Sequence, residues 1–265
     1  MTINYQLHLS DASTRSLEEN AQGASPSDSK SESESTNNYP LVLLVHGLTC
    51  DDSDWVAVIS ALNQHSFDCM TVDLRGHGKS ADLPGPYSVE QSGKDLAELI
   101  TAKSLDNVVL VGHSMGTRVV LECRDRLPDP IRQIVFVDGS CQAQGDPELA
   151  RQSMQTLLSE PDTTALMVSK MFEDMFGGTL DSRLSQQIIQ RAANMPTGRV
   201  SQLLVDMHGW DAGELENSLL RLNAAARTGF SVLQSTSLDS ARKRRNMRPG
   251  ESSDYLDLLL SLIHI

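Results

Sequence analysis

The sequence predicts an α/β fold, in which a mostly parallel, doubly wound sheet carries helices on both faces and an inserted helical cap. Short apolar runs that suit buried strands alternate with stretches of helical periodicity, a pattern typical of parallel strands joined by helices. Residues 147–223 then carry helical patterns without a convincing strand. A chain of 265 residues is long enough for one such domain with a substantial core.

The first predicted strands lie on either side of a polar insert. Residues 3–9 alternate apolar and polar side chains, as an edge strand with one solvated face does. Residues 11–38 are rich in Ser, Glu, Asp, Asn and Gly, and we expect disorder there because they lack the apolar surface that offsets ordering entropy. Residues 41–45 are an unbroken apolar run that predicts a buried strand, which ends at His46 and Gly47.

The next segment predicts helix, strand and helix in turn. We expect a helix over residues 52–62 and a third strand over residues 69–73. The loop Asp-Leu-Arg-Gly-His-Gly-Lys-Ser at 73–80 follows, and we expect its polar side chains to tie neighbouring loops together. Ser-Val-Glu-Gln at 88–91 fits a capping box, which starts a helix that runs to about residue 102.

The segment around Ser114 carries the strongest chemical signal. An apolar strand over residues 108–111 ends at Gly112, and a predicted helix over residues 115–127 follows. Gly112 and Gly116 flank the serine at positions where a side chain would clash as the chain reverses, which is the nucleophile-elbow pattern G-x-S-x-G. Such a turn lifts the hydroxyl above the sheet at a helix N-terminus, where free N–H groups favour developing negative charge.

The remaining strands flank the helical region. Residues 134–137 predict a strand that ends in Asp138, and residues 230–233 predict another that leads to Asp239. The helical region between them holds six methionines, which could line an adaptable apolar pocket, although packing between helices accounts for most of them (Met154, Met167, Met171, Met175, Met195 and Met207).

Together these motifs resemble those of the α/β-hydrolase superfamily, in its cap-bearing serine hydrolase branch. The matching sequences are His-Gly at 46–47, the loop at 73–80, Gly-His-Ser-Met-Gly at 112–116 and the strand before Asp239. The resemblance implies a first core segment, a helical cap and a second core segment (1–140, 141–227 and 228–259).

The resemblance also implies a role for each site residue. Ser114 would be the nucleophile, and the backbone N–H groups of Leu48 and Met115 would form the oxyanion hole. Asp239 would be the acid that orients the base, with Asp138, at the end of the strand after the elbow, as the alternative acid. No metal or organic cofactor is implied.

The catalytic base departs from the family pattern. A histidine should follow the acid in a loop after a last strand, but only His264 follows Asp239. Residues 260–265 read Leu-Ser-Leu-Ile-His-Ile, which the mosaic-end DNA of transposase-made sequencing libraries encodes. We therefore expect a foreign tail and a missing base, and a nearly inactive chain. In a shortened fold, His264 itself would be the base.

The expected function is hydrolysis of an ester or related acyl bond through an acyl-enzyme, on an apolar small-molecule acyl substrate. The same site would suit hydrolysis of a carbon–carbon bond, thioester cleavage or cofactor-free haloperoxidase chemistry. A non-catalytic protein that binds a small ligand is the alternative from another class. Serine at the elbow argues against dehalogenase or epoxide hydrolase chemistry, which needs an aspartate there.

Charge, cysteine spacing and hydropathy indicate which binding partners and which cellular location to expect. A net charge of -13 and a pI near 4.9 argue against nucleic acid or an anionic membrane surface as partner. The four cysteines have neither metal-like nor disulfide-framework spacing (Cys50, Cys69, Cys123 and Cys141). No apolar run reaches the roughly 18 residues of a membrane helix, and no basic-then-apolar leader begins the chain. We expect a cytoplasmic protein whose oligomeric state the sequence leaves open.

Overall fold

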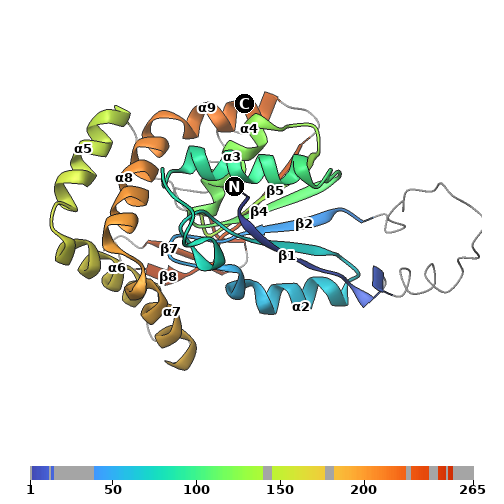
Figure 1. The fold of residues 1–265 in the computed structure, drawn as a ribbon, viewed down its shortest axis with the longest axis horizontal. Helices are drawn as coiled ribbons and strands as arrows, with labels where there is room; N and C mark the ends of the chain where they lie inside the picture. Colours follow the sequence, from blue (N-terminus) through green and yellow to red (C-terminus); the bar gives the residue numbers. More distant parts are fainter. Residues whose placement is uncertain are drawn as a thin grey trace, which may run out of the picture.

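The computed structural model describes most of the chain (residues 2–11, 13–14, 39–139, 145–176, 182–224, 228–238, 244–248 and 250–252). A central sheet has helices on both faces, and further helices lie beyond one end of its strands (Figure 1). Most of the predicted disordered insert, Asp239 and the predicted foreign tail lie outside the described residues.

The sheet confirms the predicted class. Its described strands lie in the order β1-β3-β2-β4-β5-β6 (Asn4–His8, Cys69–Asp73, Leu41–Val45, Val108–His113, Ile131–Val137 and Gly229–Leu233). Only β1 is antiparallel to its neighbour, and it occupies an edge as its alternating pattern predicts. β5 begins three residues before the predicted apolar run, because the exposed Arg132 and half-buried Gln133 interrupt the run while Ile131 is buried.

The strand order creates a switch point beside β2. The chain leaves β2 toward β3 on one side and then crosses to β4 on the other. The loops that follow β2 and β4 therefore diverge at the carboxyl edge of the sheet, which is where open α/β sheets bind ligands.

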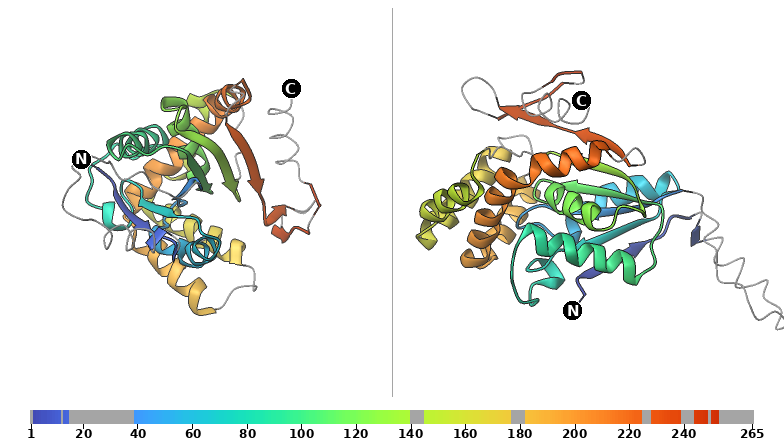
Figure 2. Two further views of the ribbon diagram at one scale, coloured as in Figure 1. Left: turned by 90° about the vertical axis from the view of Figure 1, so that its right-hand side faces the viewer. Right: turned by 90° about the horizontal axis from the view of Figure 1, so that it is seen from above.

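Helices cover both faces of the sheet, as Figures 1 and 2 show. The predicted helix over 52–62 begins as a 3-10 turn, η1 (Asp52–Trp55), and continues as α2 (Val56–Gln64) on one face. The other face carries three helices, α3, α4 and α9 (Val89–Ala102, Gly116–Arg126 and Leu215–Ala224).

The cap of α3 forms only half of the predicted capping box. The Ser88 hydroxyl accepts the Gln91 N–H at 3.0 Å, but the Gln91 side chain donates to Asp95 at 2.8 Å instead of returning to the cap. The buried Arg75 binds the same carboxylate with two hydrogen bonds of 2.8 Å, so Asp95 draws the glutamine away.

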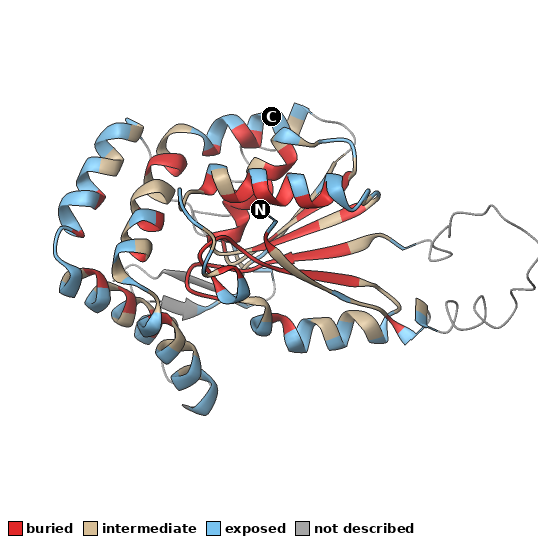
Figure 3. Cartoon of the chain, in the orientation of Figure 1, coloured by how far each residue is buried: buried red, intermediate tan, exposed pale blue. Residues whose placement is uncertain are grey.

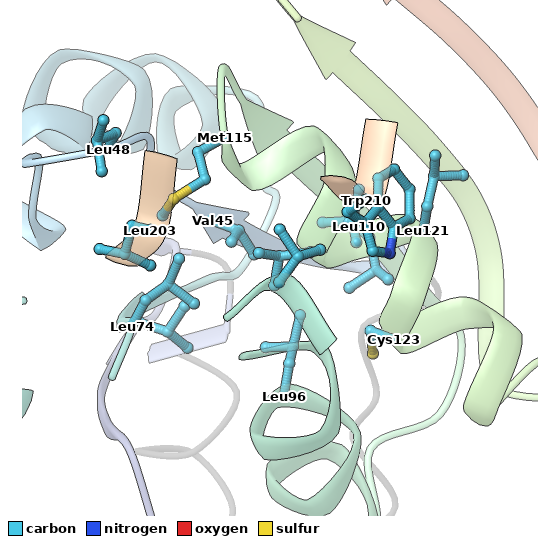
Figure 4. Close-up of a cluster of buried hydrophobic side chains, with 14 of the residues drawn as sticks. Val45, Leu48, Leu74, Leu96, Leu110, Met115, Leu121, Cys123, Leu203 and Trp210 are labelled. Atoms are coloured by element: carbon cyan, nitrogen blue, oxygen red, sulfur yellow. The ribbon is translucent and has the colours of Figure 1, made fainter. Parts of the chain in front are cut away.

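Burial is concentrated on the strands and on the helix faces that meet them (Figure 3). The larger cluster lies between the sheet and α3 and α4, and it continues into α8 (Thr197–Gly213). Figure 4 shows Leu96, Leu110 and Leu121 in this cluster, together with Leu203 and Trp210 of α8. α8 is thus part of the core as well as of the region between β5 and β6.

The region between β5 and β6 is helical, as predicted. It contains α5, α6, α7, α8 and α9, the first three of which have the bounds Pro147–Leu157, Pro161–Phe176 and Ser182–Asn194. We call α5 to α9 the inserted helices. α6, α7 and α8 lie beyond the carboxyl ends of the parallel strands (Figure 1). A small antiparallel pair, β7 (Thr236–Leu238) and β8 (Arg244–Asn246), follows β6. None of the described helices is long and apolar enough to span a bilayer.

Candidate active site

Ser114 lies at the sharp turn between β4 and α4. Its φ is 52°, a left-handed conformation that L-residues rarely adopt and that costs about 1–3 kcal/mol. Its N–H donates to the Val137 carbonyl at 3.0 Å, and its carbonyl accepts the Thr117 hydroxyl at 2.7 Å. Neighbouring strand and helix thus hold the strained residue in place.

The two flanking glycines are required by close backbone contacts. A Cβ at Gly112 would lie 2.5 Å from the Gly116 carbonyl oxygen, and a Cβ at Gly116 would lie 2.5 Å from the Val45 carbonyl oxygen. These separations are well inside van der Waals contact, so the steric reason given for the G-x-S-x-G pattern applies to this turn.

A second turn, over residues 47–50, follows β2 beside the elbow. The Cys50 N–H donates to the Gly47 carbonyl at 3.2 Å, which leaves Leu48 and Thr49 at the centre of the turn. Thr49 has a φ of 60°, unusual for a β-branched residue. Gly47 suits this close approach, because a Cβ there would lie a tight 3.0 Å from the Ser114 Cβ. We call residues 47–50 the oxyanion turn.

The predicted oxyanion donors have N–H groups that remain available. Neither the Leu48 nor the Met115 N–H donates to another backbone or side-chain acceptor within the described part of the chain. The side chains of both residues are buried in the core, so only their backbones can serve the site. Met115 directly precedes α4, and its N–H therefore belongs to the positive end of that helix.

Two stacked histidines support the oxyanion turn from the core. Their ring centroids are 4.9 Å apart. His46 accepts the Leu74 N–H through Nε2 at 3.0 Å and donates through Nδ1 to the Gly47 carbonyl at 2.8 Å. His77 accepts the Thr49 N–H at 3.2 Å through Nε2 and places Nδ1 3.1 Å from the Arg75 carbonyl. Both rings therefore bridge the loops after β2 and β3.

These hydrogen bonds require neutral histidines. Burial lowers the pKa of His46 to about 4, and burial together with the neighbouring His46 lowers the pKa of His77 to about 3. Since both ring nitrogens of each histidine are occupied, neither is placed to accept a proton from Ser114. The predicted tying role of the loop at 73–80 is therefore present, and His46 shares it.

A cavity of about 1000 Å³ opens beside Ser114 and Leu48. The inserted helices supply much of its apolar wall (Met171, Phe172, Met175, Phe176, Leu184, Ile188, Leu204 and Met207). Three of the six predicted methionines thus line the cavity, while the other three pack in or against the core cluster. Charged side chains also border it (Asp51, Asp54, Arg118, Asp138 and Arg191).

Of the two candidate acids, the structure describes only Asp138. Asp239 lies outside the described residues, so its role stays a prediction. Asp138 lies at the end of β5 with a φ of 47° and lines the cavity. Its carboxylate accepts two hydrogen bonds of 2.6 Å from Ser235, one from the N–H and one from the hydroxyl.

Two further titratable side chains border the cavity near Ser114, those of His113 and Cys50. Burial lowers the pKa of His113, which favours the neutral ring. Burial also raises the pKa of Cys50 to about 12, so its thiol stays protonated and is a poor nucleophile. Among the described residues, no cluster of His, Cys, Asp and Glu has the arrangement of a metal site.

Sequence analysis missed two arginines that join the inserted helices to the site. Arg118 lies one turn after Ser114 and donates to its carbonyl at 3.2 Å. Arg118 also binds Asp211 of α8 with two hydrogen bonds of 2.7 and 2.6 Å. A charged residue within the apolar stretch of α4 was a signal that something must neutralise it. Arg191 of α7 binds the segment after the oxyanion turn, and nothing in its local sequence indicates this partner.

The chain matches the family described as the alpha/beta hydrolase fold over residues 40–200, which is more than half of the chain. The curated 2-(acetamidomethylene)succinate hydrolase of Mesorhizobium japonicum is 32% identical over 99 residues, which make up 37% of this chain and 35% of the relative. RutD of Enterobacter cloacae is 33% identical over 101 residues, 38% of each chain. The chain thus spans well under half the length of these relatives.

Solved structures resemble the fold over more of the chain. A hydrolase from Oleispira antarctica has a TM-score of 0.65 and 19% identity, covering 86% of this chain and 80% of its own. The enol-lactonase from Burkholderia xenovorans LB400 has a TM-score of 0.60 and 17% identity, covering 87% of each chain. At these identities the likeness concerns the fold alone.

Proposed function

The chain belongs to the alpha/beta hydrolase family, and on this premise we propose that it is a serine hydrolase that cleaves an ester or related acyl bond. The observation that carries the proposal is the strained Ser114 at the start of α4, which opens onto a cavity of about 1000 Å³. Strain of this kind persists where the surrounding structure enforces it and is concentrated at functional sites. Ser114 is the proposed nucleophile.

The proposed reaction has two acyl-transfer steps. The Ser114 Oγ attacks the acyl carbon as its proton passes to a base, and the resulting oxyanion accepts hydrogen bonds from the Leu48 and Met115 N–H groups. The intermediate collapses, the alcohol leaves with the proton, and an acyl-enzyme forms. Water then attacks this ester, returns a proton to the serine and releases the acid.

The acid and the base of this reaction are assigned from the sequence. Asp239 is the proposed acid, and Asp138 is the alternative because it already borders the cavity. Among the described residues, His46 and His77 are engaged elsewhere through both ring nitrogens. We propose that the base is missing from this chain, with His264 as the base in a shortened fold as the alternative.

The proposed substrate is a small molecule with an apolar acyl group. The inserted helices would act as its cap, since Phe172 and Met175 of α6 and Met207 of α8 line the cavity. Methionine and aromatic side chains adapt to irregular apolar ligands. The three described cysteines are free, which supports the proposal of a reducing, cytoplasmic location.

Labelling by a fluorophosphonate tests this function. The reagent forms a bond between the serine oxygen and phosphorus, and fluoride leaves. With His264 as the base we expect stoichiometric attachment at Ser114, located by peptide mass spectrometry, whereas a chain without its base should be labelled there only slowly. Ser114→Ala should take no label. Attachment at another residue, or no attachment in a chain that melts cooperatively, would contradict the proposal. In the second case, thermal stabilisation by apolar esters would favour a protein that binds ligands without turnover.

A further inference from the structure

We propose that Arg191 is a positioning residue, which holds Thr49 in the backbone conformation that presents the Leu48 N–H to the site. Docking of α7 and formation of the oxyanion turn are then coupled. This inference rests on the proposed function, because it assigns a role to the turn that carries the proposed oxyanion donor.

Arg191 reaches from α7 to four acceptors on one short segment of the core. Its Nε donates to the Thr49 carbonyl at 3.2 Å. Its Nη1 donates to Asp51 at 3.0 Å and Ser53 at 3.3 Å, and its Nη2 binds the Asp54 carboxylate at 2.6 and 2.8 Å. Asp51 and Asp54 cap η1 reciprocally, so one guanidinium grips both members of that cap.

The contacts of Arg191 leave it little capacity for an anionic substrate. Two carboxylates already neutralise its charge, and all three of its nitrogens donate to acceptors of the core. Although Arg191 borders the cavity, its hydrogen bonds connect α7 to the oxyanion turn and to the segment that follows it.

Thr49 is held from both sides. Its N–H donates to His77 from the core, and its carbonyl accepts from Arg191 of α7. The two peptide groups on either side of the Thr49 Cα are therefore both fixed. Only one of these two contacts comes from the inserted helices, so movement of α7 would remove half of the restraint.

The restraint matters because Thr49 is strained. Leu48 has a negative φ and Thr49 a φ of 60°, which is the pattern of a type II turn and suits glycine at the second position. Relaxing Thr49 to a negative φ requires rotation of one of the two peptides that flank its Cα. His77 opposes rotation of the Leu48–Thr49 peptide, and Arg191 opposes rotation of the Thr49–Cys50 peptide. The Thr49–Cys50 peptide also supplies the Cys50 N–H that donates to the Gly47 carbonyl, which shares its peptide with the Leu48 N–H, so Arg191 helps to hold that N–H in place.

The strain suggests a rescue experiment. In Arg191→Gln the turn is free to relax, and we expect the rate constant of phosphonylation of Ser114 to fall about 10-fold, less than the roughly 100-fold or greater loss of a deleted oxyanion donor. The apparent affinity for the reagent should stay within about 2-fold. Arg191→Gln with Thr49→Gly should regain most of the rate, because glycine adopts a positive φ without strain.

A role of Arg191 in packing alone predicts no such rescue. Gln190→Ala is the matched control, since Gln190 is the exposed neighbour on α7 and, among the described residues, its side chain donates to Asn194 of the same helix. Arg191→Lys keeps the charge and serves if Arg191→Gln fails to fold. It cannot reach the Thr49 carbonyl and both carboxylates together, so it should lose rate as well.

Hydrogen exchange tests the coupling without any catalysis. In Arg191→Gln we expect faster exchange in peptides that cover α7 and in those that cover residues 46–51. Faster exchange in α7 alone, or a lost rate that Thr49→Gly fails to restore, would overturn the inference. If Ser114 of the parent chain takes no label, the proposed function fails, and exchange over residues 46–51 decides the role of Arg191 by itself.

Discussion

Two of the inserted helices, α8 and α7, are attached to the core in contrasting ways. α8 places Leu203 and Trp210 in the main hydrophobic cluster and adds buried polar contacts to α4. α7 meets the core segment after β2 through Arg191, whose side chain keeps 26% of its exposure. α7 also places Ala192 in the cluster, with Ile188 and Ile189 packed against it, but its contacts with the segment after β2 are partly exposed ion pairs.

The attachment of α8 combines apolar burial with paired charges. Arg118 and Asp211 have side chains only 3% and 5% exposed and form a bidentate pair. The Trp210 indole donates to Glu122 at 3.0 Å, and Asp206 accepts the Val89 N–H at 2.7 Å. Because Arg118 also donates to the Ser114 carbonyl, this attachment reaches the proposed nucleophile.

The difference indicates which side of the cavity opens. Regions with little buried apolar surface and exposed polar contacts open at lower free energy than core elements. We therefore expect α7 to move more readily than α8 when a ligand enters, while α8 and the elbow stay together as one unit.

Breaking the buried pair on the α8 side should have the largest effect. Asp211→Ala leaves the Arg118 guanidinium buried without its partner, and we expect a loss of about 3–5 kcal/mol in the free energy of unfolding. Urea unfolding followed by circular dichroism measures it.

Glu216→Gln is the control for this variant, since Glu216 is an exposed acid on α9 and should change stability by a few tenths of a kcal/mol. Replacing both partners, as in Arg118→Met with Asp211→Leu, should recover part of the loss. If Asp211→Ala lowered the free energy of unfolding by less than about 1 kcal/mol, α8 would not be firmly attached to the core.

Acid should weaken the core support beneath α7 by an intermediate amount. His46 and His77 are neutral in the fold, with pKa values of about 4 and about 3, whereas both bind protons near pH 6.5 when unfolded. Below pH 6.5 the unfolded state therefore takes up protons that the native state excludes, and stability falls as the pH falls. From pH 7 to 5.5 we expect the pair to contribute a loss of about 2 kcal/mol.

Comparison with a variant isolates this contribution from that of the carboxylates. His77→Gln keeps an acceptor for the Thr49 N–H and removes one titrating group. The slope of stability against pH between 6.5 and 5 should become shallower than in the parent chain. An unchanged slope would mean that His77 is not held neutral in the fold.

Removing the Arg191 ion pairs between α7 and the core should have the smallest effect on global stability. In Arg191→Gln we expect a loss of about 1 kcal/mol or less in the free energy of unfolding, because partly exposed ion pairs contribute little. Urea unfolding at low and at 1 M salt measures it, and salt should reduce the difference between the variant and the parent. A loss of stability as large as that expected for Asp211→Ala would show that α7 and α8 are attached to the core equally strongly.

Much of the fold could be predicted because its signals are local. The bounds of β2, β3 and α3 agree with the predicted ranges, since each is set by an apolar run or by a cap within a few residues. β5 was predicted short because alternation of exposed and buried residues interrupts its apolar run. The elbow could be predicted because Gly112, Ser114 and Gly116 report a steric need within five residues.

The contacts between α7 or α8 and the core could not be predicted in this way. Arg118 and Asp211 lie 93 positions apart, and Arg191 and Asp51 lie 140 apart. Helical periodicity shows that α7 and α8 exist but not which side chains meet the core, because that depends on how the inserted helices pack over the sheet. The left-handed backbone conformation of Thr49 could not be predicted either, since threonine gives no sequence signal for a positive φ.

The sequence by itself determined the parallel sheet, the turn that carries Ser114 and the order of the motifs, because each depends on the preferences of adjacent residues. Only the tertiary structure decided that His46 and His77 are internal supports, that Arg118 joins Ser114 to α8, and that Arg191 binds the segment over residues 49–54. These roles arise from charges and hydrogen-bond donors that find their partners through packing, and such pairing leaves no pattern in the local sequence.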